Sequence, residues 1–173
     1  MDEEVHIFAG HARGARAYHD FKIMVSTHLG VNHQNVAIVG SAKMGFSLSP
    51  AKKFKKFNDD SDLDLVIVSP KLFAELWGLH LEHRSKMFGS PGYQYSSVAK
   101  EVFRHFVTVS ERGITSEMRS QFKSWIESIG ELRKLIGRDW VLDRDINYRV
   151  YESWDYVERY HIDGLAQLAE DCA

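Results

Sequence analysis

Two aspartates open a run of residues that is otherwise apolar. Asp62 and Asp64 flank the first residue of the run Leu63–Val68. Side chains two residues apart on a strand point to the same side, so a strand here would present both carboxylates to one spot. Proteins commonly hold Mg²⁺ with one or two carboxylates, and waters and substrate phosphates complete its coordination. The pair therefore predicts a divalent metal site suited to a nucleoside triphosphate (NTP).

A small turn earlier in the chain is suited to hold the phosphates. Gly40 and Ser41 follow the short β-branched run at 36–39, with Lys43 and Gly45 close behind. A Gly-Ser turn lets backbone N–H groups approach phosphate oxygens, and a helix starting near Lys43 would direct its positive end at them. Gly40, Ser41, Lys43 and Gly45 are therefore the candidate phosphate-binding residues.

Each motif taken singly has an ordinary structural explanation. An aspartate pair commonly opens a solvated strand, and Gly-Ser commonly forms a plain turn. Their conjunction favours function, because two carboxylates heading an apolar strand are costly to bury unless ions or hydrogen bonds compensate them.

The two motifs together resemble a known superfamily. The run Val39–Gly45, followed by Asp60–Val68, is similar to the hG[ST]xxxG and DxD signature of the polymerase-beta-like nucleotidyltransferase superfamily, in its small single-domain form. The resemblance implies that Gly40 and Ser41 contact the triphosphate while Asp62 and Asp64 bind two Mg²⁺ ions. The stretch between the motifs is longer and more basic than in compact members.

The resemblance also implies a third carboxylate from a later strand. We assign it to Asp145, which the alternation of residues 145–151 places on the polar face with Asn147 and Arg149. This role requires that face to lie toward the aspartate pair. Two further acids, Asp143 and Asp139, compete for this role. If Asp145 pairs with an arginine instead, and no other acid takes its place, a non-catalytic role becomes the better hypothesis.

The expected activity is Mg²⁺-dependent transfer of a nucleoside monophosphate from an NTP to a hydroxyl, with release of pyrophosphate. ATP is the default donor because of its cellular abundance. The acceptor stays open, and a partner protein and a nucleic acid are both candidates. The alternative is a non-catalytic binding or regulatory module of the same fold, for example a subunit that neutralises a partner. No membrane partner is expected.

A basic stretch between the two motifs has two explanations. Residues 52–57 interleave four lysines with Phe54 and Phe57, which suits phosphate contacts and base stacking. We favour a solvated loop whose phenylalanines pack inward, because four charges in a chain of net charge −2 make a weak field. A P-loop NTPase is excluded, since Met44 and Gly45 stand where Gly-Lys is required.

Two other groups of residues have ordinary explanations. His80 and His83 are spaced to chelate zinc on a helix, but no third ligand is nearby in the sequence, so a surface position is expected. The tryptophans Trp125, Trp140 and Trp154 are expected to lie in the core or to line a groove.

The elements that must position these residues alternate between helix and strand. Apolar spacing predicts strands at 36–39, 63–68 and 145–151, and helices over 13–29 ending at Gly30, after Ser69-Pro70, from Thr115 or Ser116 through Met118 to Gly137, and from Ser153 onward. Residues 98–109 suit a helix, although 106–109 also suit a strand, and Gly89–Gly92 is the strongest break. The fold class is therefore α/β, a small mixed sheet flanked by helices and nucleotidyltransferase-like.

Composition narrows the setting. The 173 residues are close to the roughly 150 expected of one domain, so a single domain over residues 1–173 is predicted. Lys and Arg total 22 against 24 acidic residues, so any nucleic acid contact must be local. Cys172 is the only cysteine, which excludes an internal disulfide and a thiolate metal site. With neither a signal peptide nor a membrane-spanning run expected, the cytoplasm is the expected compartment.

Overall fold

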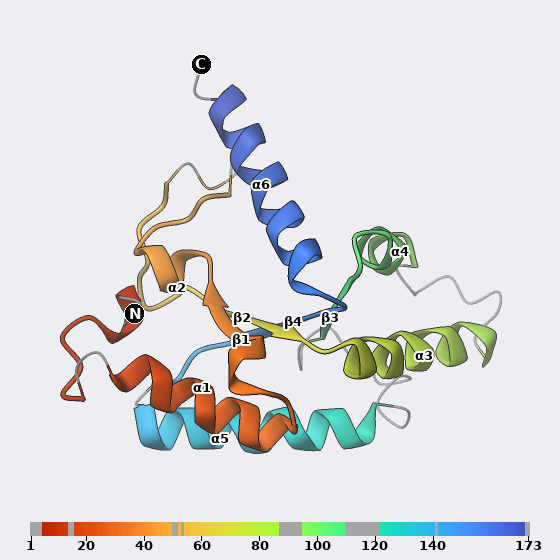
Figure 1. The fold of residues 1–173 in the computed structure, drawn as a ribbon, viewed down its shortest axis with the longest axis horizontal. Coiled ribbons are helices and arrows are strands. Elements are labelled where there is room, and N and C mark those ends of the chain that lie inside the picture. The colour runs from red at the N-terminus through yellow and green to blue at the C-terminus, as the bar shows by residue number, and fades with distance from the viewer. Residues whose placement is uncertain are drawn as a thin grey trace.

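The structure is a computed structural model, and it describes residues 5–13, 16–49, 52, 54–86, 95–109, 122–140 and 142–171. Helices and strands alternate along this part of the chain (Figure 1). In chain order they are η1 (His6–Phe8), α1 (Arg16–Leu29), η2 (His33–Asn35), β1 (Val36–Val39), α2 (Ser41–Met44), β2 (Leu63–Val68), α3 (Pro70–Lys86), α4 (Tyr95–Phe103), β3 (Phe106–Val109), α5 (Lys123–Trp140), β4 (Ile146–Tyr151) and α6 (Trp154–Asp171), where η denotes a 3₁₀ helix.

The four strands form one mixed sheet in the order β1-β2-β4-β3. β2 pairs with β4 in parallel, whereas β1 and β3 run antiparallel to their neighbours at the two edges. Because β2 and β4 are parallel and adjacent, their first residues lie side by side at the same end of the two strands. The register places Asp64 opposite Asn147. An α/β fold with a small mixed sheet is confirmed.

Helices cover both faces of the sheet. Leu63, Leu65 and Ile67 of β2 belong to the larger core, which α1, α3 and α5 complete, and Figure 1 shows α1 and α5 side by side along that face. The alternate residues Val66 and Val68 lie in a smaller cluster with α6. Asp64 shares the parity of this second set, so strand alternation directs it to the α6 side. The sheet is buried on both sides, as the nearly unbroken apolar run of β2 predicts.

The sequence expectation for α5 is wrong at its end. Gly137 does not terminate the helix, which continues to Trp140. Trp140 is buried and packs its ring against Phe8 and Phe21. Glycine inside a helix costs about 1 kcal/mol relative to alanine, less than the roughly 1.5–3 kcal/mol gained by burying a large apolar side chain. The expected start of this helix, from Thr115 to Met118, lies outside the described residues.

Both alternatives left open for residues 98–109 are present in the structure. α4 ends at Phe103, and β3 begins at Phe106. Between them His105 adopts a positive φ of 56°, a conformation that non-glycine residues rarely adopt and that ends the helix. The expected break at Gly89–Gly92 lies outside the part of the chain that the structure describes.

The expected surface position of the histidine pair on α3 is wrong. His80 and His83 are 8% and 3% exposed, and they follow the buried Leu76 at helical spacing on one face. The His80 ring lies edge-on to Phe122 with a centroid distance of 4.9 Å. Burial, and then the neighbouring His83, lower the pKa of His80 to about 4. The two histidines therefore extend the apolar face of α3.

This low pKa predicts that stability falls as the protein is acidified. The unfolded chain takes up a proton on His80 near pH 6.5 and the folded chain only near pH 4, so stability present above pH 6.5 is lost as the pH falls toward 4. The loss attributable to His80 is about 3 kcal/mol in the free energy of unfolding. Urea unfolding at pH 7 and pH 4.5 should show a smaller loss for His80→Leu than for wild type. The exposed His19→Gln is the control and should keep the full loss.

The tryptophans divide between interior and surface. Trp125 and Trp140 are buried, whereas Trp154 is 36% exposed and its Nε1 donates a hydrogen bond to Asn35 Oδ1 at 3.3 Å.

Among the helices that the structure describes, none has the length and apolar character needed to cross a membrane.

Candidate functional site

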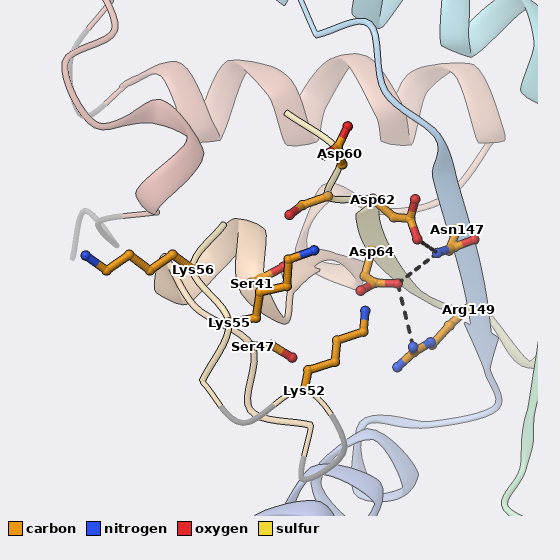
Figure 2. Close-up of a pocket in the computed structure, with 11 residues that line it drawn as sticks. Ser41, Ser47, Lys52, Lys55, Lys56, Asp60, Asp62, Asp64, Asn147 and Arg149 are labelled. Atoms are coloured by element: carbon orange, nitrogen blue, oxygen red, sulfur yellow. Dashed lines mark hydrogen bonds and ion pairs between the residues drawn. The ribbon is translucent and has the colours of Figure 1, made fainter. Parts of the chain in front are cut away.

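A polar pocket opens where β2 and β4 begin, at the edge of the sheet that carries the aspartate pair (Figure 2). We call it the β2–β4 pocket. Its volume is about 150 Å³. It is lined by Ser41, Ser47, Lys52, Lys55, Lys56, Asp60, Ser61, Asp62, Asp64, Asn147 and Arg149. Every one of these lining residues is polar or charged, and both acids and cations line the same space.

Asp62 and Asp64 lie together, as the spacing of two residues predicts. The Asn147 side chain bridges them: its Nδ2 lies 3.2 Å from Asp64 Oδ1 and 3.5 Å from Asp62 Oδ2. Both carboxylates therefore come within reach of one amide group. Their oxygens are the ligand type that Mg²⁺ prefers, so the donor chemistry of this pair fits that ion.

Arg149 completes the β4 side of the pocket. Its Nη2 lies 3.6 Å from Asp64 Oδ1, and both side chains are about one-quarter exposed. Burial lowers the pKa of the Arg149 guanidinium, but Asp64 and other nearby groups more than offset it, so the pKa lies above the ordinary arginine value. Arg149 is thus a fixed positive charge beside Asp64.

Two features of the backbone require glycine at position 40. Its φ is 66° with ψ −145°, a conformation open in practice only to glycine. A Cβ at this position would also lie 3.2 Å from Asp64 Oδ2. The next residue, Ser41, begins α2 and lines the pocket. The turn therefore brings the backbone close to the carboxylate, and Ser41 lies where the sequence expectation put it.

Two of the expected phosphate-binding residues are not among those that line the pocket. Lys43 is on the short α2 but is not one of the residues that line the pocket. Gly45 ends α2 with a φ of 83°, and a Cβ there would lie 2.9 Å from His6 Nδ1. The small size of Gly45 thus accommodates the His6 ring behind the pocket.

The basic stretch contributes its lysines to the pocket. It folds back beside α2, because Ser47 N donates to Lys55 O at 2.8 Å and Phe57 N donates to Gly45 O at 2.9 Å. Lys52, Lys55 and Lys56 all line the pocket, and in Figure 2 the Lys52 side chain extends toward Asp64 while that of Lys56 points away from the acids.

Only one of the two phenylalanines of this stretch packs inward, as we expected for both. Phe57 is partly buried and packs on the larger core. Phe54 is 48% exposed and lies near the Phe46 ring, with a centroid distance of 6.0 Å. The remaining lysine of the stretch, Lys53, lies outside the described residues.

The structure does not bring the Asp145 carboxylate to the aspartate pair. Its Oδ1 lies 3.8 Å from Arg133 Nη2, on α5, and Asp145 does not line the pocket. The regular alternation begins only at Ile146, so it turns Asn147 and Arg149 toward Asp64 but does not extend to Asp145. Asp145 serves the site through its backbone instead, because its carbonyl oxygen accepts a hydrogen bond from Leu63 N at 2.8 Å.

The competing acids also pair with arginines of α5. Asp143 Oδ1 lies 3.8 Å from Arg133 Nη2, and Asp139 Oδ1 lies 2.6 Å from Arg138 Nε. The third acid that does line the pocket is Asp60, whose side chain points away from the pair in Figure 2. Over the described ranges, the histidines, cysteines and acids form no group of three arranged to hold a metal.

We expect Asp145→Asn to leave the geometry of the pocket unchanged, because the substitution preserves the backbone carbonyl that accepts the hydrogen bond from Leu63 N. Affinity for inorganic triphosphate in the presence of Mg²⁺ should stay within about twofold of wild type, since the Asp145 carboxylate lies beside Arg133 and does not line the pocket. Isothermal titration calorimetry measures this affinity. A loss as large as that of Asp64→Asn would show that the Asp145 carboxylate reaches the pocket.

Comparisons with protein-family models, with curated proteins and with solved structures found no match for this chain.

Proposed function

We propose that the β2–β4 pocket binds the triphosphate of an NTP as its Mg²⁺ complex, and that the chain transfers the nucleoside monophosphate to a hydroxyl group. One observation carries this proposal: two carboxylates suited to a metal and several cations suited to phosphates line the same pocket of about 150 Å³. The resemblance to the polymerase-beta-like nucleotidyltransferase superfamily supports the same chemistry, because residues of both motifs line this pocket: Ser41 from the first, and Asp62 and Asp64 from the second.

The proposed roles divide between the acids and the cations that line the pocket. Asp62 and Asp64 hold the metal, while Lys52, Lys55 and Arg149 offset the charge of the phosphates. When bound, Mg²⁺ supplies charge neutralisation at the phosphoryl oxygens and activation of the attacking hydroxyl. The hydroxyl oxygen forms a bond to the α-phosphorus, the bond from that phosphorus to pyrophosphate breaks, and the hydroxyl proton passes to a carboxylate.

A second candidate is a module that binds Mg²⁺ and an NTP without transferring anything. Two observations favour it: Asn147, an amide, stands in register with Asp64, and Asp145 is paired with Arg133. An amide neither accepts the hydroxyl proton nor carries the negative charge of a third metal-binding carboxylate. Transfer then depends on Asp60 or on the aspartate pair alone.

Incubation with NTPs labelled at the α-phosphate, together with Mg²⁺ or Mn²⁺, separates the two candidates. Transfer predicts label on the protein or on an added acceptor, and its loss in Asp64→Asn. The binding module predicts tight binding of the labelled NTP with no transfer. Asp60→Asn tests the third acid, and Asp163→Asn, an exposed acid on α6, is the matched control. Absence of both binding and transfer in the wild-type protein would contradict both candidates.

A further inference from the structure

One arginine from the segment before β4 holds the loop that leads into β2. Arg144 Nη1 donates hydrogen bonds to the backbone carbonyl oxygens of Asn58 and Ser61, the second at 3.1 Å. The Arg144 side chain is only 15% exposed. The bond to Ser61 is partly buried and the bond to Asn58 is exposed. Both are charge-assisted, and partial shielding from water strengthens the bond to Ser61.

The residue that this arrangement fixes is Asp62. On its N-terminal side, the Ser61 carbonyl accepts from Arg144. On its C-terminal side, Leu63 N donates to the carbonyl of Asp145. The peptide groups before and after Asp62 are thus both held by two consecutive residues, and little rotational freedom is left to the backbone that carries this carboxylate.

The Arg144 guanidinium is itself supported from the other side of the loop. It lies over the Phe57 ring, 4.6 Å from the centroid. Phe57 is tied to the end of α2 by its hydrogen bond to Gly45, and its ring contacts His6 edge-on at 5.9 Å. The ion pair with Asp59 adds little, since that carboxylate is fully exposed. Arg144 therefore links the loop to the element that begins with Ser41.

We propose that Arg144 is a positioning residue that sets the Asp62 carboxylate relative to that of Asp64. Arg144 does not line the pocket, so it acts on Asp62 through the loop backbone. Both bonds come from the one nitrogen Nη1. Its two N–H groups lie in the plane of the guanidinium, so their directions are fixed, whereas the N–H groups of a lysine ammonium rotate about its flexible stem. This inference rests on the proposed function. It explains how the loop before β2 holds the Asp62 carboxylate in the position that metal binding requires.

Arg144→Met tests the proposal, because methionine keeps an apolar stem over Phe57 and removes the donors. Binding of inorganic triphosphate is measured by calorimetry, once with Mg²⁺ and once with a chelator. We expect the Mg²⁺-dependent affinity to fall at least about tenfold, the effect of losing charge-assisted hydrogen bonds. The Mg²⁺-free affinity should stay unchanged, since the lysines are untouched. A residue that only stabilised the fold would not produce this split in a folded variant.

Two further variants complete the experiment. Arg138→Met removes a more exposed arginine from its pair with Asp139 and should bind as wild type does. Arg144→Lys keeps the charge without the planar guanidinium, so its Mg²⁺-dependent affinity should lie between those of wild type and Arg144→Met. If Arg144→Met does not fold, the lysine variant decides the question by the same split.

The outcomes separate this inference from the function on which it rests. If wild type binds Mg²⁺-triphosphate and the folded Arg144 variants bind it equally tightly, the positioning role is wrong and the proposed function stands. If the wild-type protein shows no Mg²⁺-dependent binding, the proposed function fails and the positioning role fails with it.

Discussion

Replacing both Asp62 and Asp64 by asparagine is expected to abolish Mg²⁺-dependent binding of NTP. The amide groups preserve shape but remove the two negative charges that attract the cation. Binding of triphosphate without Mg²⁺ should become tighter in the same variant, because the carboxylates no longer repel the phosphates. Calorimetry with inorganic triphosphate, with and without Mg²⁺, measures both changes. A double variant whose binding depends on Mg²⁺ as strongly as that of wild type would place the metal elsewhere.

The two single variants should differ in stability. Asp64 lies beside the largely buried Arg149, so Asp64→Asn leaves a positive charge without its carboxylate partner. Removing one member of a fully buried pair costs about 3–5 kcal/mol, and partial exposure makes the cost here smaller. Asp62 is more exposed, and Asp62→Asn should unfold at the same urea concentration as wild type. Equal destabilisation by both changes would contradict this placement of Arg149.

The second large effect is expected from the lysines of the basic stretch. Lys52→Gln combined with Lys55→Gln should weaken the binding of Mg²⁺-triphosphate by about a hundredfold. Each lost charge-assisted contact costs roughly 1.5–3 kcal/mol, and we take the low end because both side chains are exposed. Loss of affinity should grow as the salt concentration falls, since screening weakens these contacts in wild type.

The same stretch supplies a matched control. Lys56 carries the same charge, but its side chain points away from the acids in Figure 2, so Lys56→Gln should lose no more than about threefold in affinity, a surface effect. Lys43→Gln tests the lysine that the sequence predicts to bind the phosphates. It too should have a small effect on the affinity for Mg²⁺-triphosphate. If Lys43→Gln instead weakened binding more than the double variant, the triphosphate would lie over α2 rather than beside the basic stretch.

The arrangement of acids determines how the proposed chemistry is to be tested. The pocket presents an amide, Asn147, in register with Asp64, and the expected third carboxylate, Asp145, lies near Arg133. Under the proposed function, metal binding and nucleotidyl transfer are therefore separable. Binding would need the aspartate pair and the cations, whereas transfer would also need an acceptor for the hydroxyl proton.

Local features of the site were predictable from the sequence. The strand period of two residues is set by the backbone itself, so the spacing of Asp62 and Asp64 was enough to direct both to one side. The strands 36–39 and 63–68 follow from short β-branched runs bounded by turn residues, and both are present with the expected bounds. The small mixed sheet follows in turn from the alternation of helix and strand.

The other side of the pocket depends on pairing between distant segments. Asn147 and Arg149 reach Asp64 because β4 aligns in parallel with β2, although the bonded residues Asn147 and Asp64 stand 83 positions apart. A shift of one residue in such a pairing moves every side chain to the opposite face. No local pattern sets that register. This is why the sequence led us to predict Asp145 beside the aspartate pair, where the structure places Asn147.

The sequence by itself therefore determined the aspartate pair, the Gly40–Ser41 turn and the class of fold. Only the tertiary structure decided that Lys52 and Lys55 line the pocket, that Asp145 lies with Arg133 and that His80 is buried. The physical reason is the range of the forces involved. Backbone geometry and apolar periodicity act within a few residues, whereas burial and the pairing of charges depend on which distant surfaces meet when the chain packs.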